Sequence, residues 1–123
     1  MLLLAREFSR QADGHLHVRF LDVGQGDSAL ITTPSGKVIV IDGGPDWSTL
    51  EQLGNFLPFF QRHIDVILLS HPDLDHLVRL PEIMKRYSVT ALGTTDLETA
   101  LPRDKDMFAG RRGNQVRVVR ILP

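Results

Sequence analysis

Alternation of apolar and polar residues in the first third of the chain predicts three strands, over residues 16–23, 28–33 and 37–42. One face of the first strand is apolar, and its residues are Leu16, Val18 and Phe20. Residues 34–36, Pro-Ser-Gly, are typical of a hairpin connection between the second and third strands. A Gly-Gly-Pro sequence after residue 42 interrupts the pattern. Together these segments predict a β-meander.

A helix and a buried strand are predicted next. Residues 48–51, Ser-Thr-Leu-Glu, have the spacing of a capping box, so we expect a helix to begin near Thr49. Gly54 and Pro58 are expected to break this helix into two short pieces. Residues 64–69 are continuously apolar apart from one Asp and predict the fourth strand.

Helical spacing returns in residues 80–86, where Pro81 suits the first turn and Glu82 is spaced to pair with Arg86. A short strand is expected at residues 89–92. Residues 93–113 show no period, and residues 116–122 predict a closing strand with a bulge at the adjacent Val118 and Val119. The order of elements predicts one domain of the α/β (α+β) class.

Composition limits the chemistry that the chain can carry. Of its 123 residues, 42% are hydrophobic and 24% are charged, as in ordinary globular proteins. The absence of cysteine excludes disulfides, thiolate zinc sites and a thiol nucleophile. Residues 1–5 are apolar but far shorter than the roughly 18 residues that span a bilayer, and no signal-peptide pattern follows them. Any metal ion would be held by His and carboxylate side chains.

Charge is distributed unevenly about a net value of -1. Residues 1–100 carry 8 Lys and Arg against 13 Asp and Glu, whereas residues 101–123 carry 6 against 2. The basic end of the chain has two interpretations, phosphate contact and solvated surface, and short basic segments are more often the latter.

The strongest chemical signal is a cluster of ionisable residues directly after the fourth strand: His71, Asp73, Asp75 and His76. A tight loop could turn these side chains towards one point, with His71 and Asp73 serving one metal ion and Asp75 and His76 a second. Two such ions would activate a water molecule for hydrolysis. The alternative is a capped turn, in which the carboxylates accept hydrogen bonds from backbone amides.

Three further residues are candidates for the cleft or for support of a ligand side chain. Asp27 ends a Gly-Gln-Gly-Asp turn that is either a simple hairpin or part of the cleft. Asp42 follows the third strand, where it either supports a ligand histidine or bonds the amides of the next two glycines. Ser70 directly precedes the cluster. The remaining histidines are interpreted as ordinary surface residues, and Trp47, Phe56, Phe59 and Phe60 as core or cover.

The sequence His71-x-Asp73-x-Asp75-His76 after an apolar strand resembles the His-x-His-x-Asp-His motif of the metallo-β-lactamase superfamily. Residues 20–31 (FLDVGQGDSALI), 41–44 (IDGG) and 64–71 (IDVILLSH) together resemble the lactamase-like domain of the ComEC competence proteins, in which Asp in place of the second His is usual. Those proteins take part in bacterial DNA internalisation. One departure is that Val78 and Arg79 stand where that family has glycines, which crowds the backbone near the motif.

The resemblance implies an αββα sandwich, of which this chain supplies the first half only: β-meander, helix, strand, metal-motif loop, helix and strand. Residues 1–15 would be a leader or the end of a preceding region, residues 16–92 the motif-bearing core, and residues 93–123 a loop and closing strand. A complete domain would hold two divalent ions, Zn or Mn, with Asp75 orienting the attacking water. Full-length relatives join such a domain to a membrane-embedded competence domain, outside the cytoplasm. The chain standing alone would be cytoplasmic.

Three functional hypotheses follow. The first is a metal-dependent hydrolase that acts on DNA phosphodiesters during DNA uptake. The second is a truncated half-domain without activity, which binds a partner or associates with itself through an open sheet edge. The third is a hydrolase of small molecules, because half a metal site does not specify a substrate.

Overall fold

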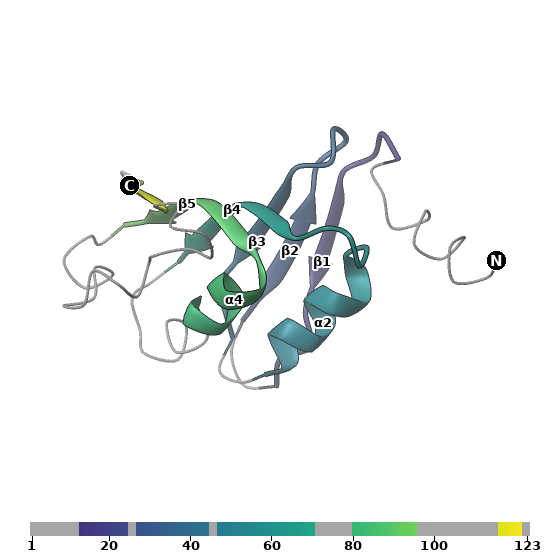
Figure 1. Ribbon diagram of the computed structural model, residues 1–123, viewed down its shortest axis with the longest axis horizontal. Coiled ribbons are helices and arrows are strands. Elements are labelled where there is room, and N and C mark those ends of the chain that lie inside the picture. The colour runs from purple at the N-terminus through teal and green to yellow at the C-terminus, as the bar shows by residue number, and fades with distance from the viewer. Residues whose placement is uncertain (1–12, 25–26, 45–46, 71–79, 96–115, 122–123) are drawn as a thin grey trace.

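The computed structural model describes residues 13–24, 27–44, 47–70, 80–95 and 116–121. Within these residues, six strands form one sheet in the order β1-β2-β3-β4-β5-β6, so strands consecutive in the chain are neighbours in the sheet (Figure 1). The strands are β1 His17–Phe20, β2 Ala29–Thr32, β3 Val38–Ile41, β4 His63–Leu69, β5 Ser88–Thr94 and β6 Arg117–Arg120. The helices are α2 Ser48–Phe56 and α4 Leu80–Arg86. The predicted α/β class is confirmed.

Strands β1, β2 and β3 form the predicted antiparallel meander. Thr33 accepts a backbone hydrogen bond from Gly36 at 2.9 Å and closes the hairpin between β2 and β3. Gly36 has a φ of 88°, a left-handed conformation that glycine adopts without steric cost. The first strand is shorter than predicted because it ends at Phe20, and the third ends at Ile41 rather than at residue 42.

Strands β3, β4, β5 and β6 are parallel to one another. Helix α2 lies between β3 and β4 in the chain, and α4 lies between β4 and β5, as expected for crossovers between parallel strands. Strand β5 continues past its predicted end at Leu92 to Thr94. The predicted bulge at Val118 and Val119 is wrong, since both residues pair in a regular register with β5.

Helix α2 corrects two predictions. It runs through Gly54 to Phe56 without a break, because Leu50 and Leu53 are buried and packing outweighs the cost of about 1 kcal/mol for one glycine in a helix. The N-cap residue is Trp47 rather than a serine, and no side chain caps this end. Leu57 then adopts an extended conformation before Pro58, so the helix ends as expected.

Helix α4 has the predicted bounds, Leu80–Arg86. The ion pair that the structure shows for Glu82 is with Lys85, at 3.3 Å, rather than the predicted one with Arg86. Pairs three apart and four apart both lie on one side of a helix, so the sequence does not select between them.

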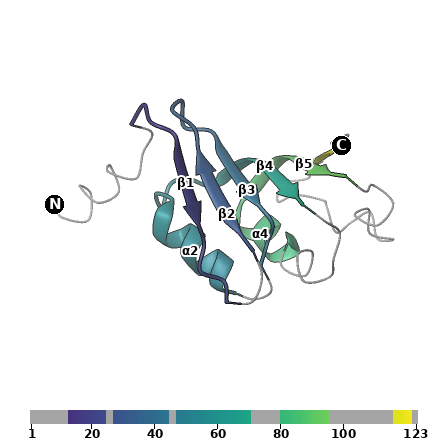
Figure 2. The same cartoon turned by 180° about the vertical axis from the view of Figure 1, so that it is seen from behind.

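Both helices cover the same face of the sheet (Figures 1 and 2). The core lies between them and the strands, and its fully or nearly fully buried members include Leu30, Val40, Ile67 and Leu92 of the sheet and Leu50, Leu53, Ile83 and Met84 of the helices. Each such side chain contributes about 1.5–3 kcal/mol by leaving water. Hydrophobic burial on this single face therefore holds β3, β4 and β5 in place.

The outer side of β1 is apolar and exposed. Arg19 lies 5.1 Å from the ring centre of Phe56, which puts Arg19 on the helix side of β1. Its neighbours Val18 and Phe20 therefore point the other way, and they are 50% and 87% exposed. The apolar stripe predicted in the first strand thus faces outward.

The four aromatic residues predicted as core or cover, Trp47, Phe56, Phe59 and Phe60, are 37–64% exposed, so none of them lies in the core. Phe59 and Phe60 instead contact each other edge to face at the surface. In the described part of the chain, no helix is both long and apolar enough to cross a membrane.

Candidate functional site

The carboxyl ends of β3 and β4 meet at one edge of the sheet. The two strands are parallel, and Ile41 pairs with Leu68 near their ends. The backbone of Asp42 then donates a hydrogen bond to the carbonyl of Leu68 at 2.8 Å. Functional groups of sheets with parallel strands collect at such edges, where the chain leaves the sheet into loops. Ser70, which lies one residue beyond β4, therefore comes close to Asp42.

Asp42 anchors the chain that leaves β4. Its carboxylate accepts one hydrogen bond from the Ser70 backbone amide at 2.9 Å and another from the Ser70 hydroxyl at 2.7 Å. Asp42 is buried and has a φ of 58°, a left-handed conformation that few residues other than glycine adopt. Such strain of roughly 1–3 kcal/mol persists only where the surroundings impose it. The Asp42 carboxylate thus holds Ser70, the residue that precedes His71 in the chain.

Ser28 holds Asp42 from the opposite side. Its hydroxyl donates a buried hydrogen bond of 2.9 Å to the backbone carbonyl of Asp42. The sequence interpretation did not identify Ser28. The sequence could have identified Ser28, because it precedes Leu30 by two residues and so lies on the core side of the chain that enters β2. A hydroxyl buried there needs a hydrogen-bond partner.

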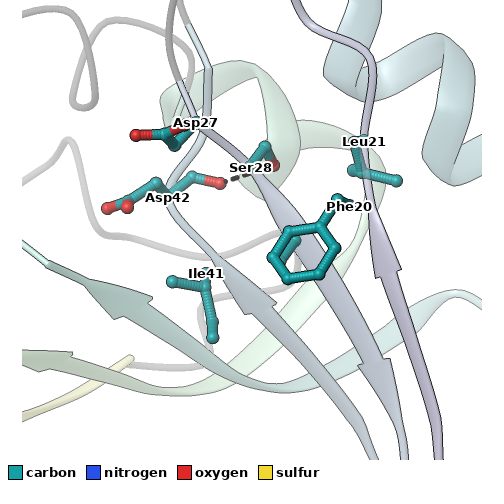
Figure 3. A pocket seen from close by; sticks show the side chains of 7 residues that line it. Phe20, Leu21, Asp27, Ser28, Ile41 and Asp42 are labelled. Atoms are coloured by element: carbon teal, nitrogen blue, oxygen red, sulfur yellow. Dashed lines mark hydrogen bonds between the residues drawn. The ribbon is translucent and has the colours of Figure 1, made fainter.

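A pocket of about 220 Å³ adjoins these residues (Figure 3). Its lining is apolar at one side and acidic at the other: Phe20, Leu21, Ala29, Ile41, Ser28, Asp27 and Asp42. The structure therefore brings Asp27 and Asp42 to one pocket, next to Ser70. Phe20 was not predicted to belong to it, because its place on an apolar stripe indicated only a strand.

The four predicted metal ligands, His71, Asp73, Asp75 and His76, lie outside the described residues. Two imidazoles and two carboxylates form a donor set that fits zinc or manganese. In the described ranges, no three His, Asp or Glu residues lie close enough together to hold a metal ion. The metal-binding role of His71, Asp73, Asp75 and His76 therefore stays a prediction.

The other histidines lie at the far end of the sheet. Asp13 accepts a hydrogen bond from the His17 ring at 2.9 Å and one from the His15 backbone amide at 2.9 Å. The hydrogen bond from His17, followed by that from His15, lowers the pKa of Asp13 to about 2. The ring of His63 contacts hydroxyls of Ser88 and Thr90, each at 2.8 Å. The rings of His17 and His63 are thus engaged in hydrogen bonds with surface side chains.

Comparison with known families decides the assignment. The family model of the metallo-beta-lactamase superfamily matches residues 21–122, most of the chain. The chain belongs to the metallo-beta-lactamase superfamily. Members of this superfamily commonly bind divalent metals and hydrolyse their substrates. The six-stranded sheet with helices on one face is consistent with the predicted partial metallo-β-lactamase fold.

Two curated relatives are endoribonucleases by name. The chain is 32% identical over 75 residues to endoribonuclease ysh1 of Schizosaccharomyces pombe, covering 56% of this chain and 10% of the relative. It is 36% identical over 76 residues to endoribonuclease YSH1 of Kluyveromyces lactis, covering 57% and 10%. The matches thus span about a tenth of the length of these relatives.

Proposed function

We propose that the chain carries the metal-binding segment of a hydrolase that cleaves nucleic-acid phosphodiesters. One observation supports this most strongly: the buried carboxylate of Asp42 holds both the amide and the hydroxyl of Ser70. Ser70 is joined directly to the segment His71–His76, which resembles the superfamily's metal motif with Asp73 in place of the second His. Because Ser70 is held in place, the side chains that follow it in this segment have a narrower range of positions.

In the proposed reaction, a bound pair of divalent ions supplies Lewis acidity and lowers the pKa of water. His71, Asp73, Asp75 and His76 would hold the ions through imidazole nitrogen and carboxylate oxygen. Asp75 would orient the attacking water towards phosphorus. A general base does this when it lies within hydrogen-bond distance of the water. Asp42 acts as a positioning residue through Ser70.

The nuclease names of the relatives support a nucleic-acid substrate, and the resemblance of residues 20–31, 41–44 and 64–71 to ComEC supports DNA. We therefore propose DNA as the substrate and DNA uptake as the setting. In that setting the chain would act beside a membrane-embedded competence domain, outside the cytoplasm. RNA is the comparison substrate.

Cleavage of plasmid DNA and of single-stranded RNA by the purified chain with Mn²⁺ tests the proposal. We expect DNA cleavage, and Asp75→Asn should lower its rate at least about a hundredfold because water is no longer oriented. Asp13→Asn is the matched control, since Asp13 is an exposed carboxylate at the far end of the sheet. Cleavage that persists unchanged in Asp75→Asn contradicts the proposal. Cleavage of RNA alone contradicts the assignment to DNA uptake.

A second candidate function is binding of a partner without catalysis, and the exposed apolar side of β1 favours it. Val18 and Phe20 are at least half exposed, and exposed apolar patches often mark interfaces. Measurement of bound metal separates the two candidates. Stoichiometric metal with a dissociation constant in the micromolar range or below supports the hydrolase, and less than one metal per chain supports the binding module.

A further inference from the structure

We infer that Ser28 is a positioning residue for the metal-binding segment, acting through the backbone of Asp42. The inference rests on the proposed function for its purpose but on described contacts for its geometry. Ser28, Asp42 and Ser70 come from three different parts of the chain and meet at one edge of the sheet. Figure 3 shows Ser28 beside the backbone carbonyl of Asp42.

The first contact in this chain of interactions fixes the backbone of Asp42. The Ser28 hydroxyl donates to the Asp42 carbonyl at 2.9 Å, and both residues are buried. On the other side, the Asp42 amide donates to Leu68 at 2.8 Å. The two hydrogen bonds restrain Asp42 at a φ of 58°, a conformation that the residue alone would seldom adopt.

The second contact transmits that conformation to β4. With its backbone left-handed, Asp42 directs its carboxylate at Ser70 instead of continuing the alternation of β3. Both donors of Ser70 bind it, at 2.9 Å and 2.7 Å. The Ser28 hydroxyl thereby helps to set where the chain enters His71. Side chains that orient metal ligands from outside the coordination shell typically change metal affinity by about 10–100-fold when they are removed.

The test uses two substitutions at Ser28 in the whole chain. Ser28→Ala removes the hydroxyl, and Ser28→Cys keeps a side chain of similar size with a weak donor, so it serves if the alanine variant does not fold. Ser35→Ala is the matched control, because Ser35 is exposed on the hairpin at the opposite end of β2. The readouts are hydrogen exchange of individual amides and titration with Mn²⁺ alone, neither of which needs turnover.

We expect both Ser28 variants to speed exchange of the Ser70 amide about tenfold and to weaken Mn²⁺ binding about tenfold. Amides of Leu30 and Ile67 should keep their wild-type exchange rates, as should all amides in Ser35→Ala. In an Asp42→Gly background, the carboxylate that accepts the hydrogen bond from the Ser70 amide is absent, so Ser28→Ala should no longer affect exchange of that amide.

Three results would overturn the inference. The first is that the exchange rate of the Ser70 amide and the affinity for Mn²⁺ both keep their wild-type values. The second is that the exchange rate of the Ser70 amide changes while the affinity for Mn²⁺ does not. The third is that the exchange rates of the Leu30 and Ile67 amides rise as much as that of Ser70. The last result would show a general loss of stability rather than positioning. A chain that binds Mn²⁺ but cleaves no nucleic acid would contradict the proposed function and leave these readouts in place.

Discussion

Replacement of Asp42 by alanine should destabilise the fold by about 2–4 kcal/mol. The substitution removes the acceptor of two hydrogen bonds from Ser70, and bonds to a charged group contribute about 1.5–3 kcal/mol each. Ser70 is exposed, so water replaces part of what is lost and the lower end of that range applies. Alanine at a φ of 58° adds about 1 kcal/mol of strain.

Glycine at the same position separates these two contributions. Asp42→Gly also removes the carboxylate but accepts the left-handed backbone, so it should be about 1 kcal/mol more stable than Asp42→Ala despite its extra chain entropy. Urea denaturation measures both differences, and the linear extrapolation is valid if the slope m stays constant. In thermal unfolding, each 1 kcal/mol corresponds to about 4 °C in Tm for a domain of this size. Equal stability of Asp42→Ala and the wild-type chain would refute the anchoring of Ser70.

Three further predictions concern buried groups and pH. Thr49→Val should raise the free energy of unfolding, measured by urea denaturation, by about 1 kcal/mol, because the buried Thr49 hydroxyl has no hydrogen-bond partner within the described residues. A lower free energy of unfolding in this variant would show that the hydroxyl has a partner. Gly44→Ala should lower the free energy of unfolding by more than about 2 kcal/mol in the same assay, because Gly44 has a φ of 67° and an added Cβ would overlap the Thr49 hydroxyl. A change under about 0.5 kcal/mol would contradict this clash. The pKa of Asp13, measured by NMR of its carboxyl carbon, should be about 2. Its folded-state pKa lies below the ordinary 3.8, so the stabilisation is complete above pH 3.8 and is lost as pH falls towards 2; His17→Asn should return the midpoint towards 3.8.

The alternation of apolar and polar residues and the helical spacing of apolar residues predicted most of the strands and one of the helices. The meander, β4 and α4 appear where alternation and helical spacing placed them, mostly within a residue or two. Continuation of α2 through Gly54 was not predictable in this way, because it depends on burial of Leu50 and Leu53 against a sheet formed by distant strands. Tertiary packing outweighs the propensity of one residue.

The candidate site shows the same division. Residue types identified His71, Asp73, Asp75 and His76 as potential ligands, which stays a prediction. The position of Asp42 depends on Ser70, 28 residues later, and on Ser28, 14 residues earlier. No local pattern contains these contacts, so only the fold could show that Asp42 binds Ser70 and Ser28.

The most direct test of the account is NMR of the histidine ring nitrogens during titration with Zn²⁺. The account predicts that Zn²⁺ shifts the ring signals of His71 and His76 and leaves those of His63 unchanged, since both of its nitrogens contact hydroxyls of β5. The signals of the two N-terminal histidines should also stay in place. Unchanged signals of His71 and His76, or shifts at His63 instead, would contradict the central claim that the segment after Ser70 binds metal.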